Sequence, residues 1–158
     1  RVETALEMLA ACENHLPVTA AIMTAAVADW RPGDMATQKM KKSTGDTPAL
    51  HLVENPDILA KLSEAGPHRP ALVVGFAAET ENLDQYARDK LARKGCDWIV
   101  ANNVAPETGV LGGDMNTVHL VSATADETWE KMSKTDIADR LVERIGAALQ
   151  SQKQVYAE

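Results

Sequence analysis

The stretch ALVVGFAAE at residues 71–79 decides the fold, because its first seven residues form an apolar run that suits a buried strand. Runs without strict alternation or charge are typical of strands covered on both faces, as in a parallel sheet. VTAAIMTAAVA at residues 18–28 has the same character, although a buried helix is the rival interpretation of so alanine-rich a run. CDWIVAN at residues 96–102 is a third, shorter candidate strand.

Helices are predicted between these strands. ENLDQYARDKLARK at residues 81–94, opened by Thr80, reads as a helix that Gly95 closes. Before the second strand, NPDILAKLSEA begins with Asn55 as a possible cap and Pro56 at the first helical position, while Asp57 complements the positive helix end. The order strand, helix, strand, helix, strand predicts an α/β fold with a parallel sheet.

The two ends of the chain complete the predicted fold. TALE at residues 4–7 is a capping box that predicts a short helix to about Asn14. NTVHLVS and TWEKM flank a turn and predict an antiparallel hairpin at the sheet edge. A final helix begins near Thr135 with an apolar stripe of Ile137, Leu141, Ile145 and Leu149, and the tail SQKQVYAE is expected to fray. We therefore predict one domain over residues 1–158, with a Rossmann-like three-layer fold, a mostly parallel sheet and an antiparallel edge hairpin.

Composition narrows the class of protein. The chain has 158 residues, a net charge of −7 and a pI of about 5.1, which disfavours a nonspecific nucleic-acid binder. No run is long and apolar enough to span a membrane. Cys12 and Cys96 lie far apart without metal-ligand spacing, which favours reduced thiols of a cytosolic protein. The chain opens on Arg1 inside a helical pattern, which suggests an excised fragment.

Polar side chains at the carboxyl ends of the predicted strands are the first candidates for a site, because ligands bind at this edge of open α/β sheets. They are Asp29 after the first strand, Phe76 and Glu79 around the end of the second, and Asn102 and Asn103 after the third. The alternative is that each of them only caps a strand or a helix.

Lysines supply local positive charge in this acidic chain. Lys90 and Lys94 share or border the face of their helix that carries Leu83, Tyr86 and Ala87. They either snorkel to solvent or point at an anionic ligand above the sheet. KMKK contributes Lys39, Lys41 and Lys42 from a long polar loop at residues 30–48, which is either solvated or a mobile lid over phosphates. With the helix start at Asn55, these groups suggest a nucleotide triphosphate site.

Several catalytic motifs are absent from the sequence. It contains no GxxxxGK[ST] phosphate loop, no GxGxxG fingerprint, no GxSxG and no HExxH, and its four histidines show no ligand spacing. A P-loop NTPase and a dinucleotide oxidoreductase are therefore disfavoured, and hydrolytic and zinc chemistry have no support.

The motifs taken together resemble a known family. AAVADWRP, KMKK, ENPDIL, VGFAAET, the helix with Lys90 and Lys94, IVANN and GGDMNTV are similar in order and spacing to phosphopantothenoylcysteine synthetase of coenzyme A biosynthesis. The resemblance is to the bacterial type, which is often fused behind a flavin-dependent decarboxylase. It implies a cytoplasmic, CTP-dependent ligase that joins 4'-phosphopantothenate to L-cysteine through an acyl-cytidylate. It further implies Mg²⁺ as cofactor, FMN only in a fused domain that is not present here, and a homodimer, with neither nucleic acid nor membrane as a partner.

The resemblance also implies roles for individual residues. Lys39 and Asp29 are the expected catalytic residues, and no Mg²⁺ ligand is assigned. The GGDMNTV segment is expected to be loop and subunit-interface structure. The expected CTP contacts come from strand end, loop and helices: Met23, Thr24, Ala25, Asp29, Lys39, Asn55, Pro56, Asp57, Ile58, Phe76, Lys90 and Lys94.

One departure from the family pattern leaves the function open. Nothing before Arg1 supplies the glycine-rich first strand or the NRSSG-like segment of the family, so an unpaired apolar sheet edge is expected. A noncatalytic nucleotide-binding or assembly module is therefore a second hypothesis. A third, disfavoured by the missing glycine fingerprint, is an NAD- or flavin-dependent oxidoreductase.

Overall fold

The computed structural model describes residues 1–34, 49–110 and 112–155. Within these residues, a five-stranded sheet has the order β1-β4-β5-β6-β7, and β2 and β3 pair in a separate ribbon. The strands are β1 (Ala20–Met23), β2 (Trp30–Pro32), β3 (Leu52–Glu54), β4 (Leu72–Glu79), β5 (Trp98–Asn103), β6 (Met115–Ser122) and β7 (Asp126–Ser133). The helices are α1 (Ala5–Glu13), α2 (Ile58–Ser63), α3 (Leu83–Lys94) and α4 (Lys134–Val155), with 3-10 turns η1 (Gly66–His68) and η2 (Pro106–Thr108).

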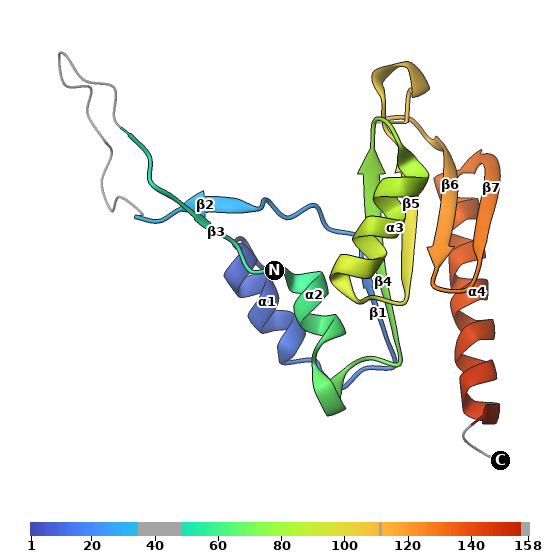
Figure 1. The fold of residues 1–158 in the computed structure, drawn as a ribbon, viewed down its shortest axis with the longest axis horizontal. Helices are drawn as coiled ribbons and strands as arrows, with labels where there is room; N and C mark the ends of the chain where they lie inside the picture. Colours follow the sequence, from blue (N-terminus) through green and yellow to red (C-terminus); the bar gives the residue numbers. More distant parts are fainter. Residues whose placement is uncertain (35–48, 111, 156–158) are drawn as a thin grey trace.

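The sheet confirms the predicted fold class. β1, β4 and β5 run parallel, and β6 and β7 add an antiparallel hairpin beyond β5. Figure 1 shows three layers, with α4 behind the hairpin on one side of the sheet and α1, α2 and α3 on the other. The parallel strands are therefore the buried ones, as their continuous apolar runs predict.

Two apolar clusters fill the spaces between the layers. On the α4 side, Trp129 of β7 is fully buried, and α4 packs against it with the predicted stripe of Ile137, Leu141 and Ile145. On the α3 side, Ala87 packs with residues that alternate along the strands, such as Val73 and Ile99. Successive side chains of a strand point to opposite faces of the sheet, so β4 and β5 each supply residues to both clusters.

Helix ends are set by local chemistry. The predicted capping box of α1 is present: the Thr4 hydroxyl accepts from the Glu7 amide, and the Glu7 carboxylate accepts from the Thr4 amide. Gly95 closes α3 in the left-handed conformation, as predicted. The start of α3 differs from the prediction, because its N-cap is Asn82, a left-handed residue, and not Thr80.

The first strand is shorter than its apolar run. The run predicted a strand over residues 18–28, but β1 ends at Met23, where its pairing with Gly75 of β4 ends. Beyond that point β4 pairs only with β5 among the described strands. Residues 24–30 are exposed instead of buried, so this part of the prediction was wrong.

Two further boundaries also need correction. The predicted loop at residues 30–48 begins with β2, which pairs with β3, while residues 35–48 lie outside the described part of the chain. The predicted lid therefore stays a prediction. The tail was expected to fray, but α4 continues to Val155. Among the described residues, no helix combines the length and hydrophobicity needed to cross a membrane.

Candidate functional site

A groove of about 760 Å³ opens where β1, β4 and β5 end, between α1, α2 and α3. It contains every residue predicted to contact the nucleotide except Lys39, which lies outside the described residues. The predicted residues in its lining are Met23, Thr24, Ala25, Asp29, Asn55, Pro56, Asp57, Ile58, Phe76, Lys90 and Lys94. Of the strand-end candidates, Asp29, Phe76 and Asn102 line this groove, whereas Glu79 and Asn103 do not. The roles of these residues toward a ligand stay predictions.

Asn55 has a different local role from the one predicted. The N-cap of α2 is Asp57, whose carboxylate accepts from the Ala60 amide at 3.1 Å, so Pro56 precedes the helix. The Asn55 side chain instead donates to the Ala28 carbonyl at 2.8 Å and accepts from Arg31 at 3.2 Å. Asn55 therefore ties the segment after β1 to the start of α2, and both segments line the groove.

Lys94 and Asp57 form an ion pair across the groove, from α3 to α2. The Lys94 side chain is 18% exposed, so it does not simply reach for solvent. Burial by itself raises the pKa of Asp57, but the bonds from Lys94 and from the Ala60 amide outweigh it and hold the pKa below its usual value. One positive charge of the groove is thus already balanced.

Lys90 is the half-buried cation of the groove. Burial lowers its pKa, as do the neighbouring Lys94 and Arg93, whereas Glu79 and Asp57 oppose that shift. None of the ion pairs within the described part of the chain involves Lys90. A nearby anionic ligand would offset the cost of holding this ammonium half-buried.

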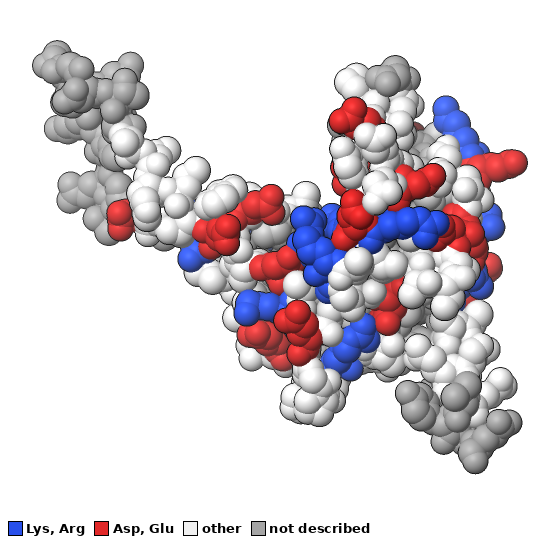
Figure 2. Space-filling model, in the orientation of Figure 1, with Lys and Arg blue, Asp and Glu red and all other residues white. Residues whose placement is uncertain are grey.

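Sequence reasoning missed Arg93 as a groove residue. Arg93 follows Lys90 by three positions, a spacing that places side chains on one helix face, and this signal could have found it. Figure 2 shows Lys and Arg side chains gathered between α2 and α3 with Asp and Glu around them. Asn102 also lines the groove. Within the described ranges, no group of three His, Cys, Asp or Glu side chains is placed to hold a metal ion.

Comparison with known proteins identifies the family. Residues 1–149 match the family described as DNA/pantothenate metabolism flavoprotein C-terminal domain. The chain belongs to this family. The fold agrees with this membership. The chain superposes on the crystal structure of the C-terminal domain of coenzyme A biosynthesis bifunctional protein CoaBC with a TM-score of 0.73. The two sequences are 30% identical, and the match covers 95% of this chain and 65% of that one.

Curated relatives carry the same name. The CoaBC protein of Haemophilus influenzae is 44% identical over 77% of this chain, and that of Escherichia coli K12 is 40% identical over 91%. The chain spans only 30% and 36% of the length of these two proteins. The flavoprotein structure from Streptococcus pneumoniae, at 20% identity and a TM-score of 0.74 over 93% of this chain and 71% of that one, supports the fold alone.

These comparisons correct the family and function expected from the resemblance. The matched family is described as the C-terminal domain of a flavoprotein of pantothenate metabolism, and not as phosphopantothenoylcysteine synthetase. None of the relatives named above is described as a ligase. The CTP-dependent ligase with its acyl-cytidylate is therefore withdrawn, together with the alternative of a noncatalytic module of that enzyme.

The expected cofactors and partners change with the family. The resemblance implied Mg²⁺ with CTP, and FMN only in a fused domain. The family to which this chain belongs is instead described as part of a flavoprotein. The same resemblance implied the partners CTP, 4'-phosphopantothenate and L-cysteine, and a homodimer. These expectations were wrong together with the family on which they rested. The family description still names pantothenate metabolism. The groove holds a half-buried ammonium, that of Lys90, which takes part in none of the ion pairs among the described residues.

Proposed function

We propose that the chain is the C-terminal part of a coenzyme A biosynthesis protein and that its groove binds a phosphate monoester. The place in the pathway is supported by the family and by the CoaBC relatives. The observation that carries the ligand class is Lys90, a half-buried ammonium that faces the groove beside Arg93 and Lys94. An ammonium that is partly desolvated binds a phosphate more strongly than one in water.

The groove offers a second surface to such a ligand. Met23, Val27 and Phe76 line it with apolar atoms, while Lys90 and Arg93 supply positive charge. The carboxylates of Asp29 and Glu54 belong to the same lining. A ligand with a phosphate and an extended or planar apolar part matches this division. The proposal assigns Lys90 and Arg93 to the phosphate and Phe76 to the apolar part.

Two phosphate monoesters are candidates. FMN is suggested by the family description, and the phosphopantothenate-cysteine conjugate was solved in complex with a Cab2 variant whose fold is similar to this chain at a TM-score of 0.61 and 18% identity. Both carry one phosphate group and a part that can contact Phe76. The lysine and arginine of the lining suit the phosphate group that both ligands share.

A cytoplasmic location is a further part of the proposal. The location is supported by the free thiols of Cys12 and Cys96, since disulfides are rare in reducing compartments.

Calorimetric titration with FMN, the phosphopantothenate-cysteine conjugate and CTP tests the ligand class. We expect one of the two monoesters to bind more tightly than CTP and Lys90→Gln to weaken that binding about tenfold. Lys61→Gln on α2, an exposed lysine outside the groove lining, is the matched control and should leave affinity unchanged. Tighter binding of CTP than of both monoesters would return the site to the triphosphate expected from the sequence.

A further inference from the structure

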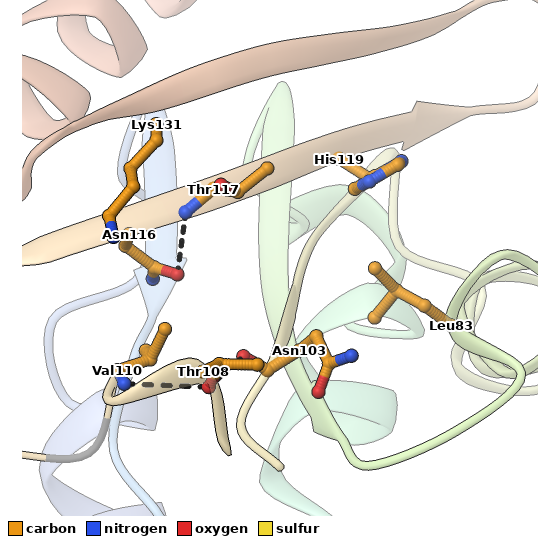
Figure 3. A pocket seen from close by; sticks show the side chains of 8 residues that line it. All are labelled: Leu83, Asn103, Thr108, Val110, Asn116, Thr117, His119 and Lys131. Carbon is orange, nitrogen blue, oxygen red and sulfur yellow. Dashed lines mark hydrogen bonds between the residues drawn. The ribbon is translucent and has the colours of Figure 1, made fainter. Parts of the chain in front are cut away.

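A second cavity lies at the end of β5, on the side of the strand opposite to the groove. It has a volume of about 230 Å³ and lies between the start of α3, the loop after β5 and the β6–β7 hairpin. Neighbouring residues at the end of β5 divide between the two cavities: Asn102 lines the groove and Asn103 lines this one. Figure 3 shows the remaining lining residues, Leu83, Thr108, Val110, Asn116, Thr117, His119 and Lys131, around the same space.

The two asparagines of the cavity have fixed amide orientations. The Oδ1 atom of Asn103 accepts from the Ala105 amide at 2.8 Å, and that of Asn116 accepts from the Thr117 amide at 2.8 Å. Each carbonyl oxygen already accepts one hydrogen bond, whereas the NH₂ group is the part of each side chain that has no partner among the described residues. The hydrogen bonds among the described residues include none from either NH₂ group. Both asparagines therefore present donors.

Lys131 adds one positive charge to these donors. Figure 3 shows its side chain directed toward Asn116. No ion pair between described residues includes Lys131, whereas the nearby His119 already lies 3.3 Å from an Asp84 oxygen and 3.4 Å from the Thr128 hydroxyl. The charge available to a ligand is thus a single ammonium with neutral amide donors around it.

We propose that this cavity binds a small monocarboxylate. A carboxylate has two oxygens that together accept from several donors, and its single negative charge balances the one ammonium of Lys131. A phosphate monoester carries close to two negative charges at neutral pH and would remain only half balanced. Leu83 and Val110 provide apolar wall for a short branched carbon chain on the same molecule.

The test uses isobutyrate as the probe and isobutyramide, its uncharged analogue of the same shape, as the control ligand. Nuclear magnetic resonance of the full chain follows the side-chain NH₂ signals of Asn103 and Asn116 during each titration. We expect saturable shifts of both signals with isobutyrate, and at least about tenfold weaker binding of isobutyramide. Equal binding of both probes, tighter binding of inorganic phosphate, or no shift with isobutyrate would overturn the proposal.

Two variants separate a binding role from a structural one. Asn116→Asp keeps an acceptor for the Thr117 amide but replaces the donor with a negative charge, so isobutyrate binding should be lost while the spectrum stays folded. Lys131→Gln should weaken binding about tenfold, and Lys61→Gln, which removes an equal charge from α2, should not. Undiminished binding in a folded Asn116→Asp protein would contradict the assignment. Neither variant touches Lys90, so this result is independent of the groove.

Discussion

Gly75 in the middle of β4 lets α2 approach the sheet, and Gly75→Ala tests that packing. A methyl group at this position would lie 2.5 Å from Cδ2 of Leu59 and 3.0 Å from Cδ1 of Ile99. Carbon atoms normally pack at about 3.5–4.0 Å, so at least one neighbour has to move. Ile99 is fully buried, which leaves the partly buried Leu59 and with it α2 to give way.

The expected cost follows from two opposing effects. Overpacking a well-filled core costs about 1–3 kcal/mol, whereas replacing a strand glycine with alanine recovers about 0.5–1 kcal/mol of backbone entropy. With the middle of each range, we expect Gly75→Ala to lower the free energy of unfolding by about 1 kcal/mol. Because α2 begins at the groove, the same change should weaken binding of the phosphate monoester.

Urea denaturation measures this prediction, and Gly146→Ala is its matched control. Gly146 lies in α4 with no atom within 4 Å of an added methyl group, so that substitution should stabilise the protein by up to about 1 kcal/mol. In the double variant with Leu59→Ala, the cost of the added methyl should be smaller than in the wild-type background. A Gly75→Ala protein as stable as the wild type would refute the packing argument.

Two further predictions concern ionisable groups. Asp57→Asn keeps a cap for the Ala60 amide but loses the charge that pairs with Lys94. It should lower the free energy of unfolding by about 0.5–1 kcal/mol at neutral pH, the range of a solvent-exposed ion pair, because the Asp57 side chain is 43% exposed. The folded-state pKa of Asp57 is lowered, so this difference in stability should be complete above pH 3.8, its ordinary pKa, and should shrink as the pH falls below that value. Urea denaturation at several pH values would check this. A difference in stability that is independent of pH would argue against the ion pair. Burial raises the pKa of both cysteine thiols, but Cys96 is buried whereas Cys12 is partly exposed. A disulfide reagent at pH 8 should therefore modify Cys12 first and reach Cys96 only in denaturant, and equal rates in the folded protein would contradict the burial of Cys96.

The fold was predictable where local chemistry fixes it. The capping box at Thr4, the left-handed Gly95 and the stripe from Ile137 to Ile145 each use interactions that the sequence spacing specifies. The hairpin of β6 and β7 followed from alternation around a turn. The strand-end rule predicted Asp29 and Phe76, and the spacing on the predicted helix predicted Lys90; all three line one groove.

Features that depend on contacts between distant segments were not predictable. β1 stops at Met23 because its pairing with β4 stops there, although the apolar run continues. α2 begins after Asp57 because the Asn55 side chain is occupied by Ala28 and Arg31, which no local pattern reveals. The ligand chemistry implied by the resemblance needed comparison with relatives for its correction, since lysines on a helix and a loop indicate an anion and not the molecule that carries it.

The measurement that tests the central claim most directly is the pKa of Lys90 with and without a bound phosphate monoester. The signal of its Cε atom, followed by nuclear magnetic resonance in an alkaline titration, reports the charge of this one side chain. Without ligand, burial should hold the pKa below the ordinary value of 10.5. A phosphate beside the ammonium favours the charged form, so saturation with the phosphopantothenate-cysteine conjugate or with FMN should raise the pKa of Lys90. An unchanged pKa in a saturated complex would place the phosphate elsewhere and contradict the account.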